Sequence, residues 1–170
     1  MQIRLFGIAI IFSVCVYLGI QYANTYRRDA SLLRQLCLHI ETMICMLRQE
    51  QSTLPEIFTR LEQEASSPLN QVFWNIGQAF AQQLYPDAGG CMASAISKVR
   101  NLPSNTREAL TEFGHTLGRF DLDGQIRGAE TVLQRAKDKL AGLERNADQR
   151  IRTYRAFGLC AGAALAILLI

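Results

Sequence analysis

The feature that most constrains the fold is the last 50 residues, Asp121 to Ile170, which contain no proline and only isolated glycines. Apolar residues recur there at steps of three and four, the spacing of a helix that buries one face. They are Ile126, Ala129, Leu133, Ala136, Leu140, Leu143 and Ala147. Because every residue after Arg155 is uncharged, we predict one helix that begins in water and ends in lipid, with residues 153–170 as a transmembrane segment.

A second apolar stretch lies near the N-terminus. Leu5 to Ala23 is a run of 19 uncharged residues, about 28 Å long as a helix and close to the hydrocarbon thickness of a bilayer. A cleaved signal peptide is the alternative, but the run is long for one and no clean small-x-small site precedes Asn24. We therefore predict an uncleaved anchor over residues 1–26.

The charges of the chain are divided between its middle and its apolar ends. Residues 29–149 carry 12 basic and 15 acidic side chains, whereas the whole chain has a net charge of +3. The remaining basic residues all flank the apolar ends: Arg4, Arg27, Arg28, Arg150, Arg152 and Arg155. Since a nucleic-acid-binding protein needs a basic surface on its folded part, this distribution argues against that class. Positive charge stays on the cytoplasmic side of a membrane, so the middle of the chain is expected in the cytosol.

The middle of the chain predicts an all-α fold. Thr53-Leu54-Pro55-Glu56 has the pattern of a helix start with a capping box, Ser67-Pro68 begins another helix, and Asn105 with Glu108 predicts a second capping box. Asp29 is expected to cap the first helix of this part, and Gly89-Gly90 to lie in a turn-rich loop. No strand pattern is present, so we predict an antiparallel bundle of about six helices over residues 27–152, the last of them continuous with the C-terminal span.

No residue pattern predicts catalysis. His39 and His115 lack partners at metal-ligand spacing, so a surface or interhelical position is expected for each. Gly89-Gly90 lacks the Lys and Ser/Thr of a phosphate loop. The five cysteines are an odd number placed on helix faces and in apolar runs, which favours reduced thiols, and Cys91 has no paired His in the sequence. We expect no enzymatic activity, no cofactor and no metal.

Two short motifs have more than one interpretation. The segment from Leu117 to Gln125 is explained as a helix end at Gly118 followed by a helix start capped by Asp121. The same segment also suits a loop that contacts a partner. Gly158 and Gly162 form a G-x-x-x-G pattern, where small residues let two helix backbones approach in lipid. The approaching helix is the N-terminal span of the same chain or a helix of another subunit, and the sequence leaves the oligomeric state open.

Several segments, in their order and spacing, are similar to one family. They are the Leu-Phe-Gly-Ile-Ala-Ile-Ile anchor, Tyr-Ala-Asn-Thr-Tyr-Arg-Arg, Thr-Leu-Pro-Glu-Ile-Phe-Thr-Arg-Leu, Leu-Gly-Arg-Phe-Asp-Leu-Asp-Gly-Gln and Tyr-Arg-Ala-Phe-Gly-Leu-Cys-Ala-Gly. The chain resembles the stage III sporulation protein AB family of endospore-forming bacteria over nearly its whole length. That family is itself similar to the cytoplasmic domains of the platform protein of type II secretion and type IV pilus machines, which are antiparallel helix bundles.

The resemblance implies a function and partners. It implies that the chain is part of the channel between mother cell and forespore and lies in the mother-cell membrane. It also implies contact with a secretion-type ATPase, stage III sporulation protein AA. The family's loop motif is matched by Gly118, Asp121 and Gln125, so the resemblance implies contact or structural roles for them. The chain departs from the family at Gly124, where a charged residue is more usual. The favoured hypothesis is a membrane platform that docks the ATPase and other channel subunits. The alternative is a two-span sensor, which would need its bundle outside the cell and an output domain after the second span.

Overall fold

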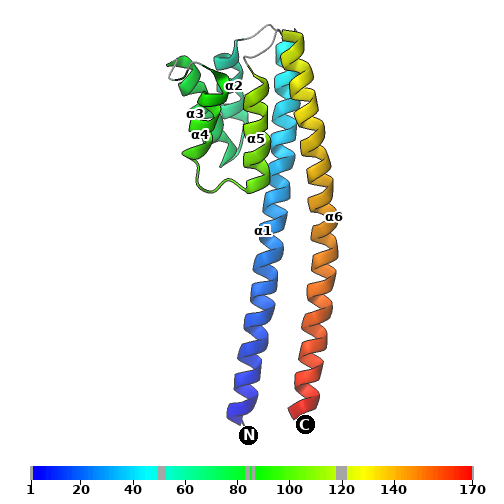
Figure 1. The fold of residues 1–170 in the computed structure, drawn as a ribbon. Coiled ribbons are helices and arrows are strands. Elements are labelled where there is room, and N and C mark those ends of the chain that lie inside the picture. The colour runs from blue at the N-terminus through cyan, green and yellow to red at the C-terminus, as the bar shows by residue number, and fades with distance from the viewer. Residues whose placement is uncertain (1, 50–52, 83–84, 86, 118–121, 170) are drawn as a thin grey trace. The chain divides into compact units, whose positions relative to one another are not determined.

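The fold is entirely helical over the part of the chain that the structure describes. The structure, a computed structural model, describes the backbone of residues 2–49, 53–82, 85, 87–117 and 122–169, and the side chains of 25–49, 53–82, 85, 87–117 and 122–145. These residues form six α-helices and no strand (Figure 1). The helices are α1 (Gln2–Gln49), α2 (Leu54–Glu64), α3 (Leu69–Ala81), α4 (Ala88–Ser97), α5 (Ser104–Thr116) and α6 (Leu122–Leu169).

The chain divides into two compact units. One comprises Ser31–Leu140, and the other Met1–Ala30 with Ala141–Ile170. Each of the 48-residue helices α1 and α6 has residues in both units. The expected helix start at Asp29 is wrong, because Asp29 lies inside α1. No proline or glycine occurs from Ile20 to Gln49, so no residue of these two types interrupts the helix there.

One stretch with described side chains is long and apolar enough to cross a membrane. It is Thr25–Gln49 of α1, with a mean hydropathy of 1.2. Because 56% of its most apolar 18-residue window is buried inside the protein, as in the core helix of a soluble domain, it gives only weak support for a membrane segment. The predicted spans, Leu5–Ala23 and residues 153–170, are helical in the backbone as far as Leu169, but their side chains lie outside the described residues.

The core of the Ser31–Leu140 unit is built from apolar side chains of all six helices. Its largest fully buried members are Phe58, Phe113, Leu33, Leu36, Met43, Ile57, Leu61, Leu69, Ile76, Met92, Leu110 and Leu117. Burying a side chain of this size contributes about 1.5–3 kcal/mol relative to leaving it in water. Helices that follow one another in the sequence pack together here: α2 contacts α3, α3 contacts α4, and α4 contacts α5 (Figure 1).

The predicted start of α2 is confirmed, and α3 starts close to its predicted position. The backbone N–H of Thr53 donates to a carboxylate oxygen of Glu56 at 3.0 Å, within the capping box that precedes the buried residues of α2. Helix α3 begins at Leu69, directly after Pro68, and the Ser67–Pro68 peptide bond is cis.

Two expectations about the next helices are wrong. Gly89 and Gly90 lie in the first turn of α4 and not in a loop. Asp87 precedes that turn in an extended conformation, and a Cβ at Gly90 would lie only 2.9 Å from a carboxylate oxygen of Asp87. Asn105 does not cap α5, because the helix already begins at Ser104, after Pro103.

The apolar stripe predicted for α6 is only partly confirmed. Ile126, Ala129 and Ala136 are buried, and so is Val132, which the predicted stripe did not include. The three predicted leucines, Leu133, Leu140 and Leu143, are half-buried, and Ala147 lies outside the residues with described side chains. An α-helix has 3.6 residues per turn, so a step of three and a step of four both keep a residue near the same face. Val132 therefore lies on the buried face, and Leu133 lies at its edge.

Candidate partner-binding surfaces

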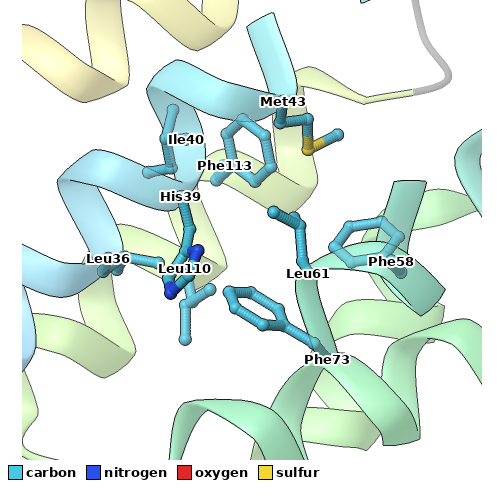
Figure 2. Close-up of a pocket in the computed structure, with 9 residues that line it drawn as sticks. All are labelled: Leu36, His39, Ile40, Met43, Phe58, Leu61, Phe73, Leu110 and Phe113. Carbon is cyan, nitrogen blue, oxygen red and sulfur yellow. The ribbon is translucent and has the colours of Figure 1, made fainter. Parts of the chain in front are cut away.

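The unit Ser31–Leu140 contains a small, partly open cavity of about 10 Å³ (Figure 2). Its lining consists of Leu36, His39, Ile40, Met43, Phe58, Leu61, Phe73, Leu110 and Phe113. All of these are apolar except His39, whose ring meets the Phe73 ring edge-on with centroids 5.4 Å apart. A cavity this small is near the lower limit for one water molecule, and its lining lacks convergent polar groups. We interpret it as a packing gap in the core.

His39 lies between α1 and α3, which is one of the two positions expected for it. Burial lowers the pKa of its imidazole below the usual value, and the negative charge of Glu64 opposes that shift more weakly. The neutral ring is therefore favoured in the folded protein. Its observed contact, with the ring of Phe73, is one of packing between helices.

The three cysteines with described side chains are free thiols. Cys37 and Cys91 are buried, whereas Cys45 is exposed. The Cys91 thiol donates to the carbonyl oxygen of Ala79 at 3.7 Å, and burial raises its pKa, which disfavours the reactive thiolate. Among the residues with described side chains, no group of three or more His, Cys, Asp and Glu is arranged to hold a metal ion.

Ion pairs between described residues connect α6 to its neighbours within this unit. Two of them join α6 to α1, Lys137 with Glu41 at 2.5 Å and Glu130 with Arg48. The other two join α6 to α5, Lys139 with Glu108 at 2.8 Å and Arg135 with Glu112. Each pair is partly exposed and adds little stability alone. Together they join charged residues of α6 to oppositely charged residues on α1 and α5.

The outward surface of α3 contrasts with this charged region. Its exposed positions are Gln71, Trp74, Gln78 and Ala81, which we call the α3 face. Trp74 is 51% exposed, although it is the largest side chain of the helix. The whole stretch of residues 65–97, which includes α3 and α4, contains a single charged residue, Asp87. A surface with an exposed aromatic residue and few charges has the composition of the central part of a protein–protein interface.

The outer surface of α4 has the same uncharged character. Helices α3 and α4 are in contact, and the exposed residues of α4 include Ala93 and Ser97. Tyr85, which lies between the two helices in the sequence and is 42% exposed, donates its hydroxyl to Ser94 at 3.1 Å. The sequence contained a signal for this surface, because Trp74 falls outside the apolar stripe of α3.

The predicted contact loop is mostly outside the described part of the chain. Gly118 and Asp121 are not among the described residues. Gln125 is half-buried in the first turns of α6. The loop therefore stays a prediction.

The residues predicted at the membrane edge and in the second span are described only in part. Arg27 and Arg28 are exposed on α1. The others are helical in the backbone of α6, and their side chains lie outside the described residues: Arg150, Arg152, Arg155, Gly158 and Gly162. Their roles as membrane-edge charges and as a helix-packing pair stay predictions.

Comparison with known proteins gives two matches. The family model for stage III sporulation protein AB matches residues 4–170. A solved structure of stage III sporulation protein AB aligns with a TM-score of 0.64 and 18% sequence identity, covering 71% of this chain and 97% of that chain. At this identity the structural similarity shows a shared fold. No curated protein matches the chain.

The family match covers almost the whole chain and includes the segments on which the resemblance was based. The chain therefore belongs to the stage III sporulation protein AB family.

Proposed function

We propose that this chain is a non-enzymatic membrane platform of a secretion-like sporulation channel, which docks a secretion-type ATPase and other channel subunits. In this proposal both apolar ends cross the mother-cell membrane that faces the forespore, and the helical bundle lies in the cytosol. Membership of a stage III sporulation family supports the sporulation role. The distribution of basic residues around the apolar ends supports the orientation.

The observation that carries the proposal is the continuity of the two long helices. Helix α1 begins in the N-terminal apolar run and ends in the bundle core, and α6 begins in the bundle and ends in the C-terminal uncharged run. A helix without a break joins its two ends without a flexible linker. Such a chain suits a subunit whose membrane segments continue directly into a bundle that binds partners.

The bundle supports this role through packing and not through a reactive group. The apolar core and the ion pairs of α6 with α1 and α5 keep the helices of the Ser31–Leu140 unit in one arrangement. The start of α6 and the loop before it, with Gly118, Asp121 and Gln125, are the proposed contact for the ATPase. Leu122 at the first position of α6 is 42% exposed and belongs to the same segment.

The proposal can be tested by photo-crosslinking in sporulating cells that produce the full chain. A photoreactive residue replaces Leu122 in one variant and, as the matched control, the exposed Leu38 of α1 in another. We expect the Leu122 position to crosslink to the secretion-type ATPase, and the Leu38 position to give little of that product. Absence of an ATPase crosslink at both positions, together with no co-purification of any channel subunit, would contradict the proposal.

A further inference from the structure

We propose that residues 122–140 of α6, which we call the α6 strap, open away from the bundle as a unit while α1 to α5 stay packed. In the structure the strap is closed against α1 and α5. It is held there by ion pairs and by few, mostly small apolar side chains, so raised ionic strength favours the open state. This inference concerns the bundle alone and does not depend on the ATPase-docking role.

The α6 strap contributes little to the apolar core. Among the residues with described side chains, the large and fully buried ones lie on α1 to α5 or directly after α5, and none lies on α6. By contrast, α2, α3 and α5 each bury a phenylalanine. The buried residues of the strap are Ile126, Ala129, Val132 and Ala136, and its Leu133 and Leu140 are only half-buried. Because hydrophobic stabilisation scales with the apolar area buried, opening the strap costs less than displacing one of those three helices.

The other helices contact one another without the α6 strap. The lining of the cavity comes from α1, α2, α3 and α5. The Phe58 ring of α2 lies next to the rings of Phe73 and Phe80 of α3, with centroids 6.1 and 5.7 Å apart. Helix α4 contacts both α3 and α5. An opening of the strap breaks none of these contacts.

The ion pairs at the edges of the α6 strap are accessible to water and salt. Lys137 pairs with Glu41 of α1, and Lys139 pairs with Glu108 of α5. The side chains of all the pairs between the strap and its neighbours are between 34% and 64% exposed. Pairs of this kind are individually weak and are screened by dissolved ions. Opening the strap returns their charges to water, so it leaves no charge buried without a partner.

Cys37 lies under the α6 strap and can report on its opening. Its side chain is 4% exposed on α1, and burial raises the pKa of its thiol, which the nearby positive charge of Lys137 opposes more weakly. Cys91 is 2% exposed, but it lies between α4 and α3, where its thiol donates to the carbonyl oxygen of Ala79. An open strap should therefore uncover Cys37 and leave Cys91 covered, whereas global unfolding uncovers both.

The experiment uses the full chain in a non-ionic detergent and N-ethylmaleimide, an uncharged thiol reagent. Mass spectrometry of the digested chain gives the labelling rate of each cysteine, and each rate is divided by its value in the urea-unfolded chain. We expect Cys37 to react about tenfold faster than Cys91 on this scale, because local opening is easier than global unfolding. Raising the sodium chloride concentration from about 0.05 M to about 0.5 M should accelerate Cys37 several-fold and leave Cys91 unchanged.

A double variant tests whether the ion pairs hold the α6 strap closed. Arg135→Gln with Lys139→Gln removes pairs that join the strap to α5 and not to α1, the helix of Cys37. Faster labelling of Cys37 in this variant would therefore come from movement of the strap as a whole. We expect an increase of about fivefold at Cys37 and none at Cys91. Circular dichroism checks that the variant keeps its helix content.

The matched control is Lys98→Gln with Arg100→Gln, which removes the same charge from two exposed residues outside the α6 strap. This control should leave both labelling rates unchanged. Any of three results would overturn the proposal: Cys37 reacts no faster than Cys91 in the wild-type chain, salt accelerates both cysteines alike, or the strap variant labels Cys37 at the rate of the control.

Discussion

At the scale of single residues, His39 shows how packing decides the chemistry of a titratable group. Its ring lies against Phe73 beside an apolar cavity, where an imidazolium would lose part of its hydration (Figure 2). Burial accordingly lowers the pKa of His39 from its usual value of 6.5, and Glu64 counteracts this only in part. A histidine that folding keeps neutral makes the protein sensitive to acid.

The stability of the folded chain should therefore fall as the pH is lowered through the range just below 6.5. In that range the unfolded chain binds a proton at residue 39 more readily than the folded chain does, so protonation favours unfolding, while well above 6.5 the contribution is complete. We expect the free energy of unfolding to decrease between pH of about 7.5 and about 5.5, and to decrease less in a His39→Gln variant. Urea unfolding followed by circular dichroism measures both. Equal slopes for the wild-type and variant chains would contradict this assignment.

At the scale of helices, two glycines of α6 differ in their surroundings. One permits close packing against a neighbouring helix, and the other has no described neighbour that requires a glycine. A Cβ at Gly128 would lie 2.9 Å from the Cβ of Thr116, at the end of α5, so this glycine permits the two helices to approach. Gly142 has no described neighbour within 4 Å of such a Cβ. The sequence alone does not distinguish these two situations, because the period of a helix does not reveal how near its neighbour lies.

Alanine at these two positions should have opposite effects. Gly142→Ala should stabilise the chain by about 1 kcal/mol, since it removes the cost of glycine in a helix and the new carbon meets no described neighbour. Gly128→Ala should destabilise it, because Thr116 must move to admit the new carbon. Denaturant unfolding of the two variants, compared with the wild-type chain, gives both signs. A stabilised Gly128→Ala variant would show that α5 and α6 are not so close.

The helices themselves were largely predictable, and their boundaries less so. The capping box at Thr53 and the buried residues of α2 followed from local chemistry, because each signal lies within a few residues of its effect. Asp29 and Asn105 have the side chains of helix caps, but the helix begins before each of them. Gly89 and Gly90 have the composition of a loop, and the sequence does not show that they form the first turn of a helix whose other end is buried in the core.

The candidate surface was only partly predictable. The position of Trp74 off the apolar stripe of α3 can be read from the sequence. Its exposure, however, depends on which faces α2 and α4 cover, and the sequence does not specify this. The ion pairs of α6 with α1 and α5 also join positions distant in the sequence, so no local pattern indicated them.

At the scale of the whole molecule, the proposed role depends on the side of the membrane on which the bundle lies. The basic residues Arg27 and Arg28 follow the first apolar run, and Arg150, Arg152 and Arg155 precede the last. This pattern predicts a cytosolic bundle, where an ATPase would find it. The sensor alternative requires the opposite orientation.

The most direct test uses the Cys45 thiol, which is exposed in the bundle while Cys37 and Cys91 are buried. Intact cells that produce the chain without forming a forespore, so that it lies in the outer cell membrane, are treated with a membrane-impermeant maleimide before and after lysis, and a Cys45→Ser variant identifies the labelled position. The proposed topology predicts labelling of Cys45 only after lysis. Labelling of Cys45 in intact cells, lost in the Cys45→Ser variant, would place the bundle outside the cytosol and contradict the platform role.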